Sequence, residues 1–244
     1  MAIELPQPVV DFLNFIGVSF PQINEDSVRA FGSHVREFAQ NIQNTHASAT
    51  STVQQVGQAY EASSYDLLVS RWADMSDAHM KELVEACNTV ATAMDVAADF
   101  IIGKKIEAIA QFAVMAAEFI ADQAASVATL GLAEAAEVAI VAAAKELGKF
   151  LEQELEQYLI GEVLQAAMPP LVEAVEKAVG GMVFNAVSDL LDGGDSAGAQ
   201  VGPGFSINPE MLESYSNVFD QHATEIEGHS QTLMSNLQTL NFNG

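Results

Sequence analysis

Basic residues and cysteine are scarce in this chain of 244 residues, and each scarcity excludes a class of function. Nine Lys and Arg residues stand against 33 Asp and Glu, which gives a net charge of -24, and no Lys or Arg follows Lys177. Such a surface repels phosphate backbones and anionic lipid heads, so we expect no nucleic-acid binding. The single cysteine, Cys87, excludes an intrachain disulfide and a cysteine metal cluster.

Proline and long uncharged runs are also lacking. No proline occurs between Gln22 and Met168, and half of all residues are hydrophobic, so the sequence predicts an all-α fold. Acidic residues bound the apolar runs Ala108–Ala117 and Gln123–Ala133, which are shorter than the roughly 18–20 uncharged residues of a spanning helix. We therefore expect a buried helical core in preference to membrane insertion. Met1–Pro6 has no basic leader, so we expect no ordinary secretory signal.

One segment of the chain occurs twice as a pattern. The stretch beginning Ile23-Asn24 aligns without a gap with the stretch beginning Ile207-Asn208. Each copy opens with Asn as a helix N-cap and acidic residues in the first turn, then continues with apolar residues in 3–4 spacing. This spacing is typical of a helix that packs along a partner helix. The repeat therefore directs the functional analysis toward packing and partners.

The apolar pattern predicts an elongated antiparallel helical hairpin or bundle with an Ala-rich helical middle and a C-terminal helix. We expect a short helix within Ile3–Gly17, long heptad helices on either side of a Trp-bearing elbow, and a helix that ends or kinks at Met168-Pro169-Pro170. The predicted domains are a helical domain over 1–192, a flexible linker over 193–204, and the start of a second module over 205–244.

A family resemblance rests on the order of segments at the start of the chain. These are Ile3-Glu4-Leu5-Pro6-Gln7-Pro8, a short hydrophobic helix, and then Phe20-Pro21 followed by Asn24-Glu25-Asp26. This order resembles the WXG-like N-terminal domains of actinobacterial polymorphic toxins, and it is similar to the N-terminal region of the mycobacterial channel-forming necrotising toxin. The resemblance covers roughly 1–192. It implies export through type VII secretion without a classical signal peptide, from the cytoplasm where the protein is made.

The resemblance also implies two kinds of site. An aromatic elbow between the long helices falls on Trp72, with Tyr65 and Leu68 beside it, although Ala73-Asp74 follows the Trp where a strict W-x-G motif has Gly. Type VII substrates often carry a Y-x-x-x-D/E motif, and Tyr158 and Glu162 have that spacing. A Tyr on a helix face with a nearby Glu would show the same spacing without being an export motif. The second copy carries a further apolar stripe, formed by Tyr215, Phe219, Ile226 and Leu233. This stripe either faces a partner protein or packs on the first hairpin of the same chain.

Polar groups in the sequence give little sign of catalysis or of cofactor or metal binding. His222 and His229 replace apolar positions of the seam, which is the row of residues at 3–4 spacing by which the second copy would pack on a partner helix, and Glu225 is near them. Polar residues at such positions favour a role in setting the register of helix pairing over a metal site. The two imidazoles also predict that this helix pairing is pH-sensitive near pH 6.5. The acidic loop around Asp189, Asp192 and Asp195 lacks the full spacing of a calcium loop. No phosphate loop or nucleophile motif is present, so we expect no enzyme activity, no cofactor and no metal.

These observations together favour a non-catalytic targeting and delivery module of a type VII-secreted toxin. Its expected partners are a small helical WXG-type protein and the secretion ATPase, bound by helix packing. The alternative is a membrane-active, pore- or channel-forming module that inserts its Ala-rich hairpin, Ile102–Ala144, at low pH. A homo-oligomer formed through exposed seams is a third option.

Overall fold

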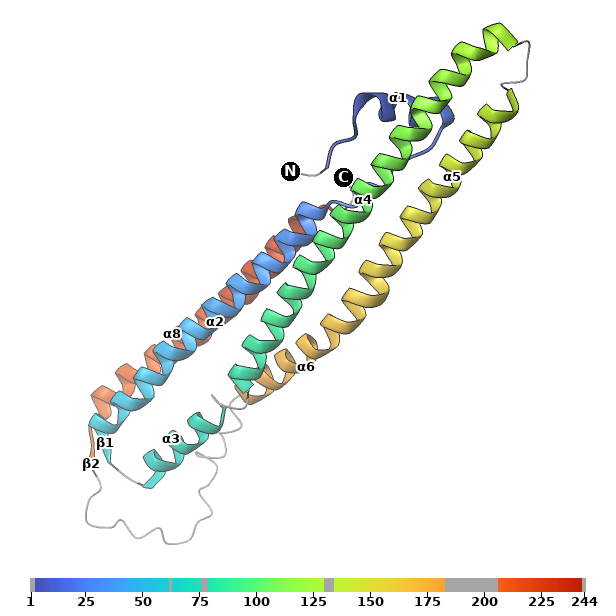
Figure 1. The fold of residues 1–244 in the computed structure, drawn as a ribbon. Coiled ribbons are helices and arrows are strands. Elements are labelled where there is room, and N and C mark those ends of the chain that lie inside the picture. The colour runs from blue at the N-terminus through green and yellow to red at the C-terminus, as the bar shows by residue number, and fades with distance from the viewer. Residues whose placement is uncertain (1–2, 62, 76–78, 130–133, 183–205, 243–244) are drawn as a thin grey trace. The chain divides into compact units, whose positions relative to one another are not determined.

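The computed structural model describes residues 3–61, 63–75, 79–129, 134–182 and 206–242. The fold is all-α, as predicted, with helices and two two-residue strands in this order: α1 (Gln7–Ile16), α2 (Glu25–Ala59), β1 (Tyr60–Glu61), α3 (Ser63–Met75), α4 (Lys81–Thr129), α5 (Glu134–Glu156), the π-helix η2 (Gln157–Leu164), α6 (Gln165–Met182), β2 (Ser206–Ile207) and α8 (Pro209–Thr239) (Figure 1).

The described elements divide into two compact units, each built from separate stretches of chain. The first unit comprises Met1–Phe31, Thr92–Ala166 and Leu240–Gly244, and the second comprises Gly32–Ala91 and Ala167–Thr239. The predicted boundaries 1–192, 193–204 and 205–244 stay predictions, and the predicted linker over 193–204 lies outside the described residues.

In the first unit, α4 and α5 lie side by side, and α1 packs on α4 (Figure 1). The helix α1 has Pro6 as its N-cap and Pro8 in its first turn. It ends at Gly17, whose left-handed backbone (φ 68°) lets its N–H and that of Val18 donate to carbonyls of the last turn. The rings of Phe12 and Phe119 lie 5.4 Å apart, and both side chains are buried. The apolar face of α1 therefore closes the core of this unit.

A buried ion pair ties three segments of the first unit together. Lys105 of α4 donates to the Glu25 carboxylate at 2.6 Å and to the backbone carbonyl of Ile23. The N–H of Ile3 donates to the other carboxylate oxygen of Glu25 at 2.6 Å. Burial on its own would raise the pKa of Glu25, but these hydrogen bonds and the Lys105 charge together lower it. The pair fixes where the N-terminal segment and the start of α2 meet α4.

In the second unit, α8 lies along α2, and α3 contacts both helices (Figure 1). The 3–4 spacing predicts an apolar seam along α2, and these members of it within this unit are buried: Val35, Ile42, Thr45, Ala49, Thr52, Val53 and Val56. Phe38, which the same spacing predicts for the seam, is half-buried, and its neighbour Ala39 is buried. Cys87 of α4 is buried too, and burial raises its pKa to about 11, as expected of a core thiol.

One local prediction concerns two adjacent prolines. We expected the helix to end or kink at Met168-Pro169-Pro170, and it does not end there, because α6 continues through both prolines. The irregular turn comes earlier in the chain, where Gln157–Leu164 is a π-helix. A proline lacks one N–H and crowds the carbonyl four residues before it, so Pro169 and Pro170 act on the carbonyls of Gln165 and Ala166, directly after the π-helix.

Candidate functional site: the tryptophan elbow and the α2–α8 pair

Trp72 is held by two polar residues of α2 in the second unit. Its indole Nε1–H donates to the hydroxyl oxygen of Thr50 at 2.8 Å, and its ring stacks on the imidazole of His46 with centroids 5.2 Å apart. The Thr50 hydroxyl in turn donates to the carbonyl of His46 at 2.9 Å. Trp72 is half-buried, and its N–H has a partner, so this chain of contacts fixes the rotamer of its side chain.

His46 and Thr50 were not predicted as members of the site. They stand one helical turn apart on α2, beside the apolar seam, and that spacing was the available signal. Burial lowers the pKa of His46, because the surroundings of its ring disfavour the charged form. His46 is therefore a neutral, stacking imidazole around neutral pH.

The other predicted elbow residues lie on α3. The Tyr65 hydroxyl donates to the carbonyl of Gln54 at 3.3 Å. A Cβ atom added at Gly57 would stand 2.7 Å from the Tyr65 ring, so the glycine makes room for that ring against α2. Leu68 is half-buried. Tyr65 and Trp72 thus dock α3 on α2 through aromatic rings that also donate hydrogen bonds.

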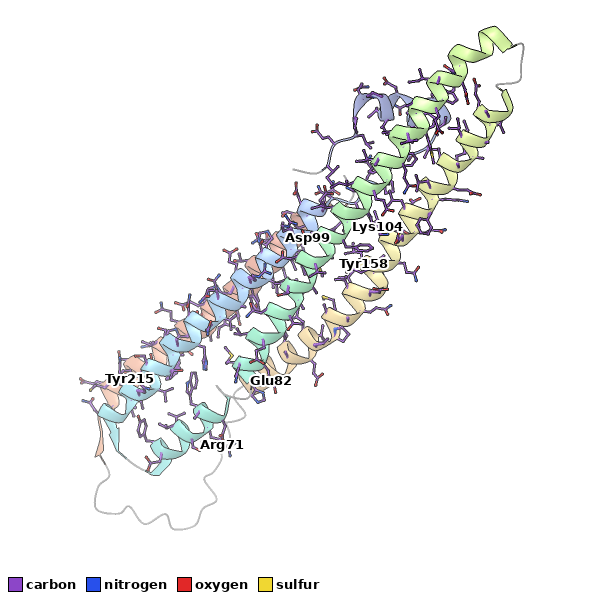
Figure 2. The ribbon with its side chains drawn as sticks, viewed as in Figure 1. Arg71, Glu82, Asp99, Lys104, Tyr158 and Tyr215 are labelled. Carbon is purple, nitrogen blue, oxygen red and sulfur yellow. The ribbon has the colours of Figure 1, made fainter. Side chains whose placement is uncertain are left out.

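The predicted stripe of α8 meets the elbow at one point. The rings of Phe219 and Trp72 lie 6.0 Å apart at an angle of 57°. Tyr215, which Figure 2 labels near the start of α8, is half-buried, as are Ile226 and Leu233. The structure therefore joins Trp72 and Phe219 in one aromatic cluster with His46.

A polar cluster lies in the middle of the α2–α8 pair. The Thr45 hydroxyl is 3.1 Å from Nε2 of His229 and 3.5 Å from the carboxylate of Glu225. Nδ1 of His222 is 3.5 Å from the same carboxylate oxygen of Glu225. The bond with His222 is the main reason that the pKa of Glu225 is lowered. His222 is buried, and its Nε2 has no hydrogen-bond partner among the described residues.

The predicted export residues belong to the first unit, where both lie in η2. The Tyr158 ring stacks on Phe100 of α4 with centroids 3.8 Å apart (Figure 2). Lys104 lies 5.7 Å above the Phe100 ring and forms an ion pair with Glu154 at 2.8 Å. Glu162 is exposed. Tyr158 is thus a packing residue at a helical irregularity, while the Glu162 carboxylate faces solvent.

The described residues also bear on metal binding and on membrane crossing. Within them, no cluster of three His, Cys, Asp or Glu residues could hold a metal ion. A surface depression beside η2 has Glu156 as its one ionisable lining residue, together with Gln153, Gln157, Ile160 and Gly161. Over the same described stretches, we find no helix with the length and apolar character that a bilayer crossing requires.

Comparison with known families gives one match. The family described as WXG100 like domain matches residues 4–147, a stretch that includes α1, α2, α3, α4 and the start of α5. Comparison with curated proteins and with solved structures gave no match. WXG100-like domains are associated with type VII secretion, whose substrates lack a classical signal peptide. The match covers more than half of the chain and spans the elbow at Trp72, so this all-α, type VII secretion-related protein belongs to the WXG100-like family.

Proposed function

We propose that this protein is the non-catalytic targeting module of a type VII-secreted polymorphic toxin of actinobacterial type. A small helical WXG-type partner and the secretion ATPase recognise it by helix packing, and the module leaves the cytoplasm as their cargo. The observation that carries the proposal is the Trp72 elbow, which lies inside a WXG100-like match and is fixed by His46, Thr50 and Phe219.

The physical basis of recognition is shape and apolar surface. The elbow presents half-buried aromatic side chains on rigid helices, and such side chains supply large contact area at small entropic cost when a partner covers them. A rigid site also binds with little reorganisation. The exposed carboxylate of Glu162 is the candidate contact for the export machinery, because it faces solvent beside the packed Tyr158.

The test is co-expression with small helical proteins from the same genomic neighbourhood, followed by a pull-down, and export from a type VII-competent host. We expect a stable complex and secretion. Thr50→Val, which removes the acceptor of the indole N–H, should weaken the complex several-fold, whereas Thr89→Val on α4 should not. Glu162→Gln should reduce export and leave the complex intact. Absence of both complex and export would refute the proposal.

A second candidate function is membrane binding by the Ala-rich hairpin. The favouring observation is apolar exposure on α4 and α5 of the first unit, where Ile106, Val114, Ile120 and Val138 are each more than half exposed. Glu107 and Glu118 are exposed on α4 as well, and their ionised carboxylates oppose insertion. Dye release from liposomes at pH 5, absent at pH 7.5, would support this function. Liposomes that stay sealed at pH 5 would exclude it.

A further inference from the structure

The two copies of the internal repeat pair with each other. Thr45 of α2 and His229 of α8 occupy equivalent positions of the two copies, 184 residues apart, and their side chains lie 3.1 Å apart. His34 of α2 contacts Asn236 of α8 at 3.3 Å, and Tyr60 of β1 pairs antiparallel with Ile207 of β2. As the numbering rises along α2 it falls along α8. The helices therefore run antiparallel and present the same seam to each other, related by an approximate two-fold axis near Thr45 and His229.

The burial of the two copies is unequal. The α2 seam is buried almost without interruption from Val35 to Val56. In α8, Pro209–Thr239, the buried residue is His222, and the apolar stripe beside it is half-exposed. Apolar burial stabilises a helix in proportion to the apolar area removed from water. Since most of the α8 stripe keeps part of its surface in water, α8 is the more weakly held member of the pair.

The seam of α8 also carries polar residues at its centre. His222 stands where the first copy has the apolar Phe38, while His229 stands where it has Thr45 and contacts Thr45 of α2. The buried Nε2 of His222 lacks a partner among the described residues, and an unpaired buried polar atom weakens the seating of its helix. A helix with an apolar side chain at the position of His222 would therefore fit the α2 seam better than α8 does.

Charge adds to the mismatch. Five carboxylates and no basic residue occur in Pro209–Thr239, and the chain as a whole carries a net charge of -24. The acidic surface repels this helix and attracts a basic one. A second copy of the chain would bring the same negative charge, so charge complementarity favours a basic helix of another protein.

We propose that the face of α2 covered by α8 is a docking surface for a basic amphipathic helix of another protein, which displaces α8. The partner helix carries apolar residues at 3–4 spacing, an apolar residue at the position that His222 occupies in α8, and Lys or Arg on its outer face. In its absence α8 covers the seam and keeps it out of water. The inference rests on the proposed function insofar as both involve a helical partner, and it adds the surface and the chemistry of that partner.

The probe is a fluorescently labelled peptide with the sequence of residues 206–242. It carries the change His222→Phe, and Lys replaces its exposed acidic residues Glu213, Asp220 and Glu227. We expect it to bind the full chain in an anisotropy titration. Binding should speed amide exchange along α8 while α2 stays protected. A scrambled peptide of the same composition is the control for non-specific attraction.

Two variants of the full chain make displacement measurable. Ile226→Ala removes apolar contact from α8 and should tighten peptide binding about tenfold, because 1.4 kcal/mol corresponds to a factor of ten. His222→Phe should strengthen the seating of α8 and weaken peptide binding by a similar factor. Glu210→Gln, at an exposed position on α8, should leave binding within twofold. Equal affinity in all three variants would mean that the peptide binds elsewhere, and would overturn the proposal.

Other outcomes separate this proposal from the proposed function. Peptide displacement of α8, together with failure of every pull-down and of export, would refute the secretion role and leave the docking surface in place. A native complex in which α8 stays fully protected from exchange would refute displacement alone. Concentration-dependent dimers of the full chain that exchange α8 would identify a second copy as the occupant, and would overturn the choice of a basic partner.

Discussion

Two neighbouring lysines show what a sequence can and cannot tell at the scale of single residues. Lys104 and Lys105 are chemically identical, yet Lys105 is buried against Glu25 while Lys104 is more exposed and pairs with Glu154. Their periodicity places Lys105 on the core face with Ile101 and Ala108, but a charge there is rare unless it is paired. The partner comes from a residue 80 positions away, and only the packed fold reveals it.

Replacement of these lysines should have unequal effects. Lys105→Met leaves the carboxylate of Glu25 buried without its cation and should destabilise the protein by about 3–5 kcal/mol. Lys104→Met removes a mostly solvent-screened pair and should leave the free energy of unfolding nearly unchanged. Urea unfolding followed by circular dichroism measures both. Equal losses from the two variants would contradict the assignment of Lys105 to the core.

Two glycines offer a matched pair of the same substitution. A Cβ at Gly148 of α5 would lie 2.9 Å from a methyl group of Val18, whereas a Cβ at Gly103 of α4 meets nothing within 4 Å. Gly148→Ala should therefore destabilise the first unit by about 1–3 kcal/mol through overpacking. Gly103→Ala should stabilise it by about 0.5–1 kcal/mol, because alanine costs less entropy in a helix. Thermal unfolding of the two variants checks the opposite signs.

The imidazole of His46 should link stability to pH. Its pKa in the folded protein is lowered below 6.5 by burial, so the unfolded chain binds more protons between that lowered pKa and 6.5. Stability should fall as the pH decreases through this window. The emission of Trp72, the one tryptophan of the chain, should change in the same range because the two rings stack. In His46→Gln, the pH-dependent change of emission should disappear; a persisting change would assign it to another group.

At the scale of elements, residues at the helix ends predicted where helices begin. The repeat predicted Asn24 and Asn208 as N-caps, and each side-chain oxygen accepts from the N–H three residues on, at 3.1 and 3.2 Å. Gly17 ends α1 as a left-handed cap. The π-helix Gln157–Leu164 was missed, since wide turns depend on how the helix packs and have no residue pattern of their own.

The two caps give a prediction for their helices. Asn24→Ala and Asn208→Ala each remove an acceptor from an N-terminal turn and should cost about 1 kcal/mol. The loss should be local, so hydrogen exchange should rise at Ser27 in the first variant and at Met211 in the second. Asn24→Asp and Asn208→Asp keep a capping oxygen and serve as controls. Unchanged exchange at Met211 in Asn208→Ala would show that the cap does not stabilise α8.

For the molecule as a whole, residue order was enough to predict an all-α fold and a WXG-like relationship. The pairing of α8 with α2 was left open, because 3–4 spacing shows that a helix packs on another without naming which one. The spacing of Phe219 in the sequence is equally consistent with a contact to Trp72 and with a contact to a separate protein. In the structure Phe219 contacts Trp72, while Tyr215, Ile226 and Leu233 are half-buried, so the role of the stripe in binding a partner stays a prediction.

The charge of the whole chain should make its stability depend on salt. With 33 acidic and 9 basic residues, like charges repel in the folded protein more than in the expanded unfolded chain. Raising NaCl from 10 to about 150 mM shortens the screening length from about 30 to about 8 Å, so the melting temperature should rise by several degrees. Choline chloride at equal ionic strength should act alike, since screening depends on charge and not on a bound ion. A fall in melting temperature would mean that ion pairs such as Arg29–Asp99, at 2.5 Å, outweigh the repulsion.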